Sequence, residues 1–176
     1  MAPAVATPLA HGSWSASSAA PTRPAISRQK HIFALLSLCR AEYGRDTRAK
    51  IPQQWQRLTP YLGKVPGQVG DDAYGVCLAS DPDCRFEYLA GVAVSSPDRL
   101  SEGFTTIKVD ARRYAVFTHA GHVSSLPATI DTIWAKWAPD CGLPVAHGAP
   151  CFERYTPEFD LGTGLGGIEV WIPLSA

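Results

Sequence analysis

Two stretches of this chain follow the same order of expected elements: helix, loop, strand, turn, strand. The order occurs over residues 46–94 and again over residues 124–174, and "GVAV" (91–94) matches "GIEV" (167–170). Two such modules would pair their strands in one sheet and place both helices on one side, which leaves a groove on the other. The repeat therefore predicts an α+β fold of two pseudo-repeated helix-plus-antiparallel-strand modules, with a concave sheet groove opposite the helices.

Helical periodicity predicts one long helix in each module. Apolar side chains three and four positions apart mark one face of residues 46–62 and one face of residues 125–138, where Ser124 or Ser125 is a good N-cap. These side chains are Ile51, Trp55, Leu58 and Leu62 in the first helix, and Leu126, Ile130, Ile133, Trp134 and Trp137 in the second. We expect both faces to pack on the sheet, with their tryptophans as the largest anchors.

Short apolar runs bounded by turn residues predict the strands. They cover residues 73–79, 86–94, 104–110, 112–120, 151–156 and 168–172. Residues 63–72 ("GKVPGQVGDD") are predicted to form a loop, because they are rich in Gly, Pro and Asp. Residues 31–43 are either a first strand or a short helix, since an unbroken apolar run has no diagnostic period.

The predicted last strand, residues 168–172 ("IEVWI"), carries the main candidate for a functional site. Successive side chains of a strand point to opposite faces, so its three β-branched residues share one face while Glu169 and Trp171 share the other. A half-buried carboxylate usually has a partner or a task. We therefore expect Glu169 and Trp171 to face the groove, with Ala93 at the position equivalent to Glu169 in the first module.

Tyr114 and Tyr74 are further candidates for the groove. A tyrosine combines apolar area with a hydroxyl that needs a partner, which suits either a pocket or the edge of a core. Aromatic faces attract cations and stack on aromatic rings, each contact contributing about 1 kcal/mol. A carboxylate among such rings would bind cationic aromatic ligands, or would activate water as a general base. Glu169 thus supports binding or catalysis.

Charge, hydropathy and cysteine spacing exclude several classes of function. The 16 basic and 16 acidic residues balance without a basic stripe, which argues against a nucleic-acid partner. Apolar runs are far shorter than the ~20 residues that cross a bilayer. The five irregularly spaced cysteines are expected to be reduced, as in a cytoplasmic protein. His119 and His122 are expected to be strand-end and turn residues, and we predict no metal and no cofactor.

The first 29 residues differ from the rest of the chain. They are rich in Ala, Pro and Ser, contain no acidic residue and show no period. We expect residues 1–29 to be a disordered tail, with a mis-assigned start codon or a transit peptide as the alternatives, and residues 30–176 to be the folded domain. Nothing before residue 46 reads as a helix-turn-helix.

Several segments in a fixed order resemble the GyrI-like, AraC-type effector-binding family, which duplicates an SHS2 module. The segments are "IPQQWQRL", "GDDAYGVC", "YLAGVAV", "EGFTTIKVDARRYAVFTHAGHVSSLPATIDTIWAKWAP", "FERYTPEFD" and "TGLGGIEVWIPL". The resemblance covers about residues 46–174 and implies an α+β fold enclosing a groove for small, often cationic or aromatic molecules. The family's central acidic residue falls on Glu169, whereas Ala93 stands where many members carry a second acidic residue.

The resemblance also implies what the chain does. Members of the family occur as the ligand-sensing parts of transcription activators and as stand-alone proteins. We expect a stand-alone protein that binds cationic or aromatic small molecules and so senses or sequesters toxic compounds. The alternatives are a hydrolase of cyclopropanoid DNA-alkylating toxins, with Glu169 as its general base, and a gyrase-inhibitor-type interaction protein.

Overall fold

The strands form a single antiparallel sheet in the computed structural model, which describes residues 24–29, 32–37, 40–43, 51–78, 86–96 and 103–175. Along the sheet the order is β1-β7-β9-β8-β4-β5-β2-β6, and β3 also pairs with β5. The strands are β1 (Ala25–Gln29), β2 (Ile32–Ser37), β3 (Arg40–Tyr43), β4 (Gln68–Leu78), β5 (Phe86–Val94), β6 (Thr105–Val109), β7 (Arg112–His119), β8 (Cys151–Tyr155) and β9 (Ile168–Leu174).

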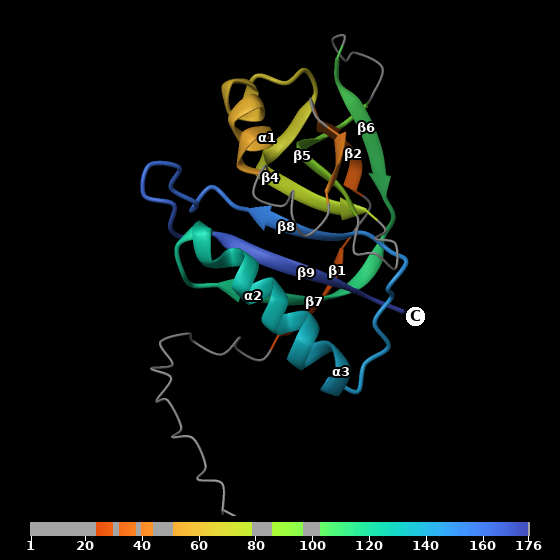
Figure 1. The fold of residues 1–176 in the computed structure, drawn as a ribbon. Helices are drawn as coiled ribbons and strands as arrows, with labels where there is room; N and C mark the ends of the chain where they lie inside the picture. Colours follow the sequence, from red (N-terminus) through yellow and green to blue (C-terminus); the bar gives the residue numbers. More distant parts are fainter. Residues whose placement is uncertain are drawn as a thin grey trace, which may run out of the picture.

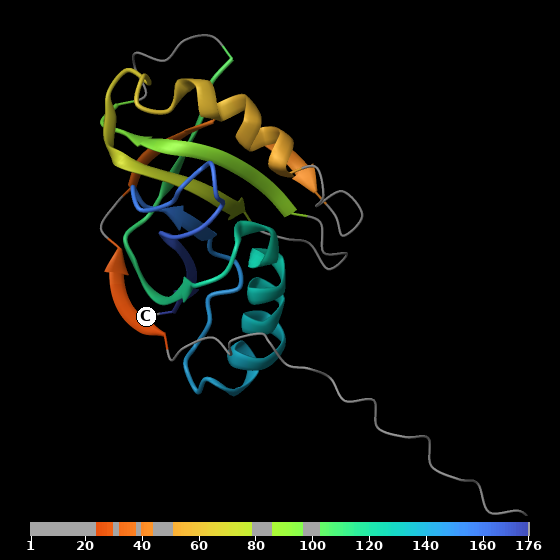
Figure 2. The same ribbon diagram turned by 90° about the vertical axis from the view of Figure 1, so that its left-hand side faces the viewer.

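Two helical segments cover one side of this curved sheet (Figures 1 and 2). The first is α1 (Ile51–Leu58), which a 3₁₀ turn (Thr59–Tyr61) extends. The second consists of a 3₁₀ turn (Val123–Ser125), α2 (Leu126–Thr132), one π-helical turn (Ile133–Trp137) and α3 (Ala138–Asp140).

The two predicted modules are present. The first contributes α1 with the hairpin of β4 and β5, and the second contributes α2 with the pair β8 and β9. The modules join where β4 pairs with β8, near the middle of the sheet. The predicted α+β architecture, with the helices on one side, is therefore confirmed.

The main core lies between the helices and the sheet, and strand alternation determines which residues enter it. Val92, Val94, Ile168, Val170 and Ile172 all belong to this core, as the alternation predicts. Of the residues on the helix faces, Leu58, Leu126 and Ile133 are buried, whereas the tryptophans pack at the margin of the core and are partly buried.

Several predicted boundaries are wrong. Residues 68–72, predicted as a loop, belong to β4, where a register shift between Gln68 and Ala73 accommodates a glycine with positive φ, Gly70. For the run at 31–43, by contrast, the strand alternative is confirmed, since its described residues form β2 and β3. The helix predicted from residue 46 is described from Ile51, and residues 44–50 lie outside the described part. Pro139, predicted just beyond the second helix, lies inside α3.

Part of the predicted disordered tail is also a strand. Residues 25–29 form β1, which pairs in register with β7 from Ala25 opposite Val116 to Gln29 opposite Arg112. The side-chain pattern gives no sign of this strand, because Ile26, its one large apolar residue, is 48% exposed. Backbone pairing with an existing edge accounts for it. Residues 1–23 lie outside the described residues.

The histidines and cysteines occupy structural positions where they are described. His119 ends β7, with Nδ1 2.9 Å from Oγ1 of Thr129. His122 rather than a serine caps the second helical segment, since its Nδ1 accepts from the backbone N–H of Ser124. Cys141 and Cys151 are free thiols. In the described part of the chain no group of three or more possible ligands could hold a metal, and no helix there could cross a membrane.

Candidate functional site

An aromatic cluster lies on the face of the sheet opposite the helices. Its members come from four strands: Tyr74 of β4, Tyr114 of β7, Phe152 of β8 and Trp171 of β9. Val76, Leu89 and Val109 complete this second core. The structure thus brings the three predicted aromatic site residues together on one face, and it adds Phe152.

Phe152 is the centre of the aromatic cluster. Its ring stacks on Trp171 at a centroid distance of 5.3 Å with 17° between the planes. The rings of Tyr114 and Tyr74 meet it edge-on at 5.0 Å and 6.1 Å. These are the offset and T-shaped geometries that aromatic pairs prefer, and each contributes about 1 kcal/mol beyond burial.

The rings of the aromatic cluster are buried against one another. Tyr74, Tyr114 and Trp171 are only 7%, 1% and 6% exposed. Burial raises the pKa of Tyr114 to about 12, and burial together with the charge of Asp72 raises the pKa of Tyr74 to about 12. Both phenols are therefore neutral, and the Tyr114 hydroxyl donates to the carbonyl of Pro150 at 3.4 Å.

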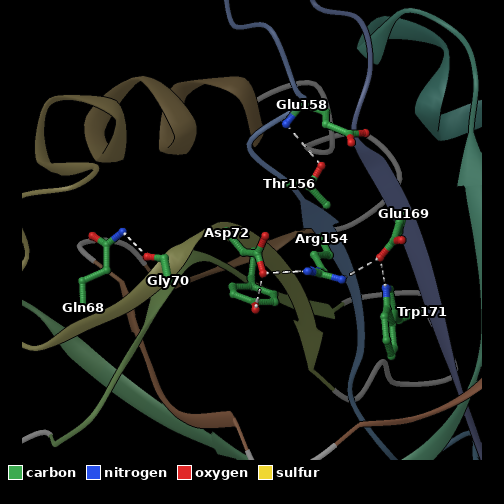
Figure 3. Close-up of polar contacts among 9 residues, drawn as sticks. Gln68, Gly70, Asp72, Arg154, Thr156, Glu158, Glu169 and Trp171 are labelled. Carbon is green, nitrogen blue, oxygen red and sulfur yellow. Dashed lines mark hydrogen bonds and ion pairs between the residues drawn. The ribbon is translucent and has the colours of Figure 1, made fainter.

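A charged cluster of Asp72, Arg154 and Glu169 contacts two of these rings, Tyr74 and Trp171. Figure 3 shows the three charged residues with Trp171 beside Glu169. The cluster follows from register, because Arg154 of β8 pairs with Tyr74 of β4 on one side and with Glu169 of β9 on the other. Asp72 shares a face of β4 with Tyr74, two residues away, and the Tyr74 hydroxyl lies 3.4 Å from its Oδ2.

Arg154 bridges the two carboxylates unequally. Its Nε and Nη2 donate to Oδ2 of Asp72 at 3.0 and 2.9 Å, while its Nη1 reaches Oε2 of Glu169 at 3.3 Å. The side chains remain partly open to solvent, at 33% for Arg154, 20% for Asp72 and 26% for Glu169. Burial lowers the pKa of Arg154, but the hydrogen bond and charge of Asp72 and the charge of Glu169 outweigh it, so that this pKa is raised.

Glu169 joins the charged cluster to the aromatic cluster. The indole N–H of Trp171 donates to its Oε2 at 2.9 Å, from the same face of β9 two residues further on (Figure 3). Both recorded contacts of this carboxylate use Oε2. The result is an oriented, partly exposed negative charge beside a buried aromatic cluster, and such a carboxylate attracts cations.

Three residues of this face were missed by sequence reasoning: Asp72, Phe152 and Arg154. Phe152 and Arg154 are two positions apart in the predicted strand "CFERYT", so strand alternation predicts that they share one face. Asp72 gave none, because it stands in a stretch that reads as a loop. Ala93 packs against the same core as the aromatic cluster, as its predicted equivalence to Glu169 requires.

A third acidic residue, Glu153, lies on the opposite face of β8, under α1. It is 8% exposed and accepts hydrogen bonds from the hydroxyls of Tyr88 at 2.8 Å and Tyr155 at 3.2 Å. The indole N–H of Trp55 in turn donates to the Tyr88 hydroxyl at 3.0 Å. This network joins the first helix to the sheet and takes no part in the charged cluster.

Comparison with known families identifies the domain. The family model of the GyrI-like small molecule binding domain matches residues 39–175. The chain belongs to the GyrI-like family. The GyrI-like match covers both modules and every residue of the aromatic and charged clusters.

A curated relative of this GyrI-like chain is the transcriptional regulator BrlR of Pseudomonas aeruginosa. It is 32% identical over 110 residues, which cover 62% of this chain and 40% of the regulator. The aligned region thus spans less than half of that relative's length.

Solved structures share the GyrI-like fold at low sequence identity. SAV2435 bound to tetraphenylphosphonium has a TM-score of 0.70 at 18% identity, and the match covers 87% of this chain and 94% of SAV2435. A transcription regulation protein from Staphylococcus aureus has a TM-score of 0.66 at 19% identity, with 87% and 98% covered. The C-terminal domain of EcmrR has a TM-score of 0.59 at 15% identity, with 86% and 96% covered.

Proposed function

We propose that this chain binds lipophilic aromatic cations on the face formed by the aromatic and charged clusters, and thereby senses or sequesters such compounds. One observation carries the proposal: the Glu169 carboxylate is 26% exposed and is oriented by the indole of Trp171, at the edge of four packed rings. A partly desolvated carboxylate beside aromatic faces stabilises a cation through charge and through the ring quadrupoles together.

The net charge of the site supports the same ligand class. Two carboxylates and one guanidinium leave the charged cluster with one negative charge. The bound ligand of SAV2435, tetraphenylphosphonium, combines a single positive charge with aromatic rings, and SAV2435 shares the fold. A cation of this kind would place its charge at the partly exposed Glu169, beside the aromatic cluster.

Calorimetric titration with tetraphenylphosphonium tests the proposal. Tetraphenylborate is the matched probe, because it has a similar shape and the opposite charge. Glu169→Gln keeps the size of the side chain and removes the charge, so cation binding should weaken by about 1–3 kcal/mol, the scale of a charge-assisted hydrogen bond. Binding of tetraphenylborate should not weaken.

Glu158→Gln is the control variant. It removes another carboxylate, an exposed one on the connection between β8 and β9, and should leave both titrations unchanged. Equal affinity of wild type and Glu169→Gln for tetraphenylphosphonium would reject the proposal. Hydrolysis of a cyclopropanoid by Glu169 stays a prediction from family resemblance, and mass spectrometry of water addition to such a compound would test it.

A further inference from the structure

We propose that Arg154 is a displaceable internal cation. Without a ligand its guanidinium pairs with the Glu169 carboxylate, and the positive charge of a bound ligand replaces the guanidinium there. The inference rests on the function proposed above and adds the residue that decides which cations bind. Arg154 would act by competition, so its effect on affinity has the opposite sign to that of Glu169.

The distances within the charged cluster indicate which contact gives way. Two donors of the guanidinium hold Oδ2 of Asp72 at 2.9 and 3.0 Å, whereas a single donor reaches Glu169 at 3.3 Å. Hydrogen bonds weaken with distance, and a guanidinium bound through two N–H groups is fixed more firmly than one bound through a single group. Asp72 is therefore the firm partner of Arg154, and Glu169 is the partner that can be released.

Arg154 and Glu169 each keep a hydrogen-bond partner after a ligand breaks the contact between them. Arg154 keeps its two bonds to Asp72, and Glu169 keeps the indole N–H of Trp171 at 2.9 Å. No group of the cluster is left buried and unpaired, which is the costly outcome when an ion pair opens. The exchange therefore costs one long, partly exposed contact.

Arg154 also sets the valence of the preferred ligand. With Arg154 present the charged cluster carries one net negative charge, which a monocation neutralises. Without it the cluster would carry two, and like charges left close together would favour a dication. We therefore infer a site selective for monovalent lipophilic cations, with dications disfavoured by the guanidinium that remains on Asp72.

Arg154→Met tests the competition directly. The affinity for tetraphenylphosphonium should rise about fivefold, which is ~1 kcal/mol at 1.4 kcal/mol per tenfold and the scale of a partly exposed ion pair. The affinity for p-xylylene-bis(triphenylphosphonium), a dication of the same class, should rise more. Arg154→Gln provides a second variant should the first fold poorly, as judged by circular dichroism and thermal unfolding.

Lys108→Met is the charge control. It removes one positive charge from another ion pair with an aspartate, Lys108–Asp110, whose side chains are 61% and 68% exposed. Lys108 alternates with Ile107 and Val109, which face the aromatic cluster, so it points away from that face. This variant should change neither titration.

Asp72→Asn distinguishes displacement of Arg154 from an effect of the net charge of the cluster alone. It removes the firm partner, so Arg154 stays on Glu169 and the affinity for tetraphenylphosphonium should fall. The fall should be larger with Arg154 present than in the Arg154→Met background. Equal falls in the two backgrounds would overturn the displacement.

The failure of this inference can be told apart from the failure of the proposed function. If Glu169→Gln weakens cation binding while neither Arg154 variant strengthens it, Arg154 is not a competitor and the proposed function stands. If wild type and Glu169→Gln bind tetraphenylphosphonium equally, the proposed function is rejected and this inference with it.

Discussion

Glu153 and Arg154 are neighbours on β8, yet their side chains lie on opposite faces of the sheet in opposite electrostatic settings. Arg154 is paired with two carboxylates and partly open to solvent, whereas Glu153 is buried against two phenols. Burial raises the pKa of Glu153 to about 7, although the hydrogen bonds from Tyr88 and Tyr155 lower it. One strand thus supplies a charged, partly exposed side chain on one face of the sheet and a buried acid under α1 on the other.

The buried acid makes the free energy of unfolding depend on pH. The pKa of Glu153 is about 7 in the folded protein and 4.5 ordinarily, so the folded state binds the extra proton between these values. This contribution is fully present below pH 4.5 and is lost as pH rises through 7, by roughly 3 kcal/mol. Urea unfolding at pH 5 and at pH 8 measures this effect. The free energy of unfolding should fall less between the two pH values for Glu153→Gln than for wild type.

Glu158→Gln serves as the control for that measurement, since its carboxylate is exposed and its removal should leave the pH dependence of wild type in place. Identical pH profiles for wild type and Glu153→Gln would show that Glu153 is ionised in the folded protein at pH 5.

Gly75 faces Glu153 across the pairing of β4 with β8 and leaves the room that this acid network needs. A Cβ atom at Gly75 would overlap the Tyr88 hydroxyl and Oε2 of Glu153. Gly75→Ala should therefore destabilise the protein by about 1–3 kcal/mol, the usual cost of overpacking. Gly148→Ala is the control, because a Cβ there meets nothing within 4 Å. Equal stability of the two variants in urea unfolding would contradict the packing of this network.

Removal of β1 should expose the edge of β7. A chain beginning at Pro24 keeps the strand, and a chain beginning at Lys30 lacks it; the second should be less stable by about 1–3 kcal/mol, the net value of a few lost hydrogen bonds. The exposed edge should also raise the tendency to aggregate. Urea unfolding and light scattering on the two chains measure both effects. Equal results would show that β1 contributes nothing to stability, as expected of a disordered tail over residues 1–29.

The sequence was most informative where a strand lies inside the sheet. β9 runs between β7 and β8, so each of its faces meets a defined environment and the alternation of "IEVWI" placed Glu169 and Trp171 correctly on one side. The same logic placed Val92 and Val94 under the helices. A residue's face follows from local chemistry alone, because the side-chain period of a strand is two.

The partners across the strands could not be predicted in this way. Asp72 and Arg154 are 82 positions apart, and their contact depends on the register of β4 with β8 and on the irregularity between Gln68 and Ala73. Register is set by the whole sheet rather than by either segment. The pairing of β1 with β7 was missed for the same reason, because it rests on backbone groups that every sequence carries.

The junction of β4 with β8 runs through the charged cluster. Asp72 comes from one module, and Arg154 and Glu169 come from the other. The proposed binding face therefore resembles a subunit interface carried on a single polypeptide: neither module alone contains the charged cluster, so a ligand bound there would depend on the correct pairing of β4 with β8.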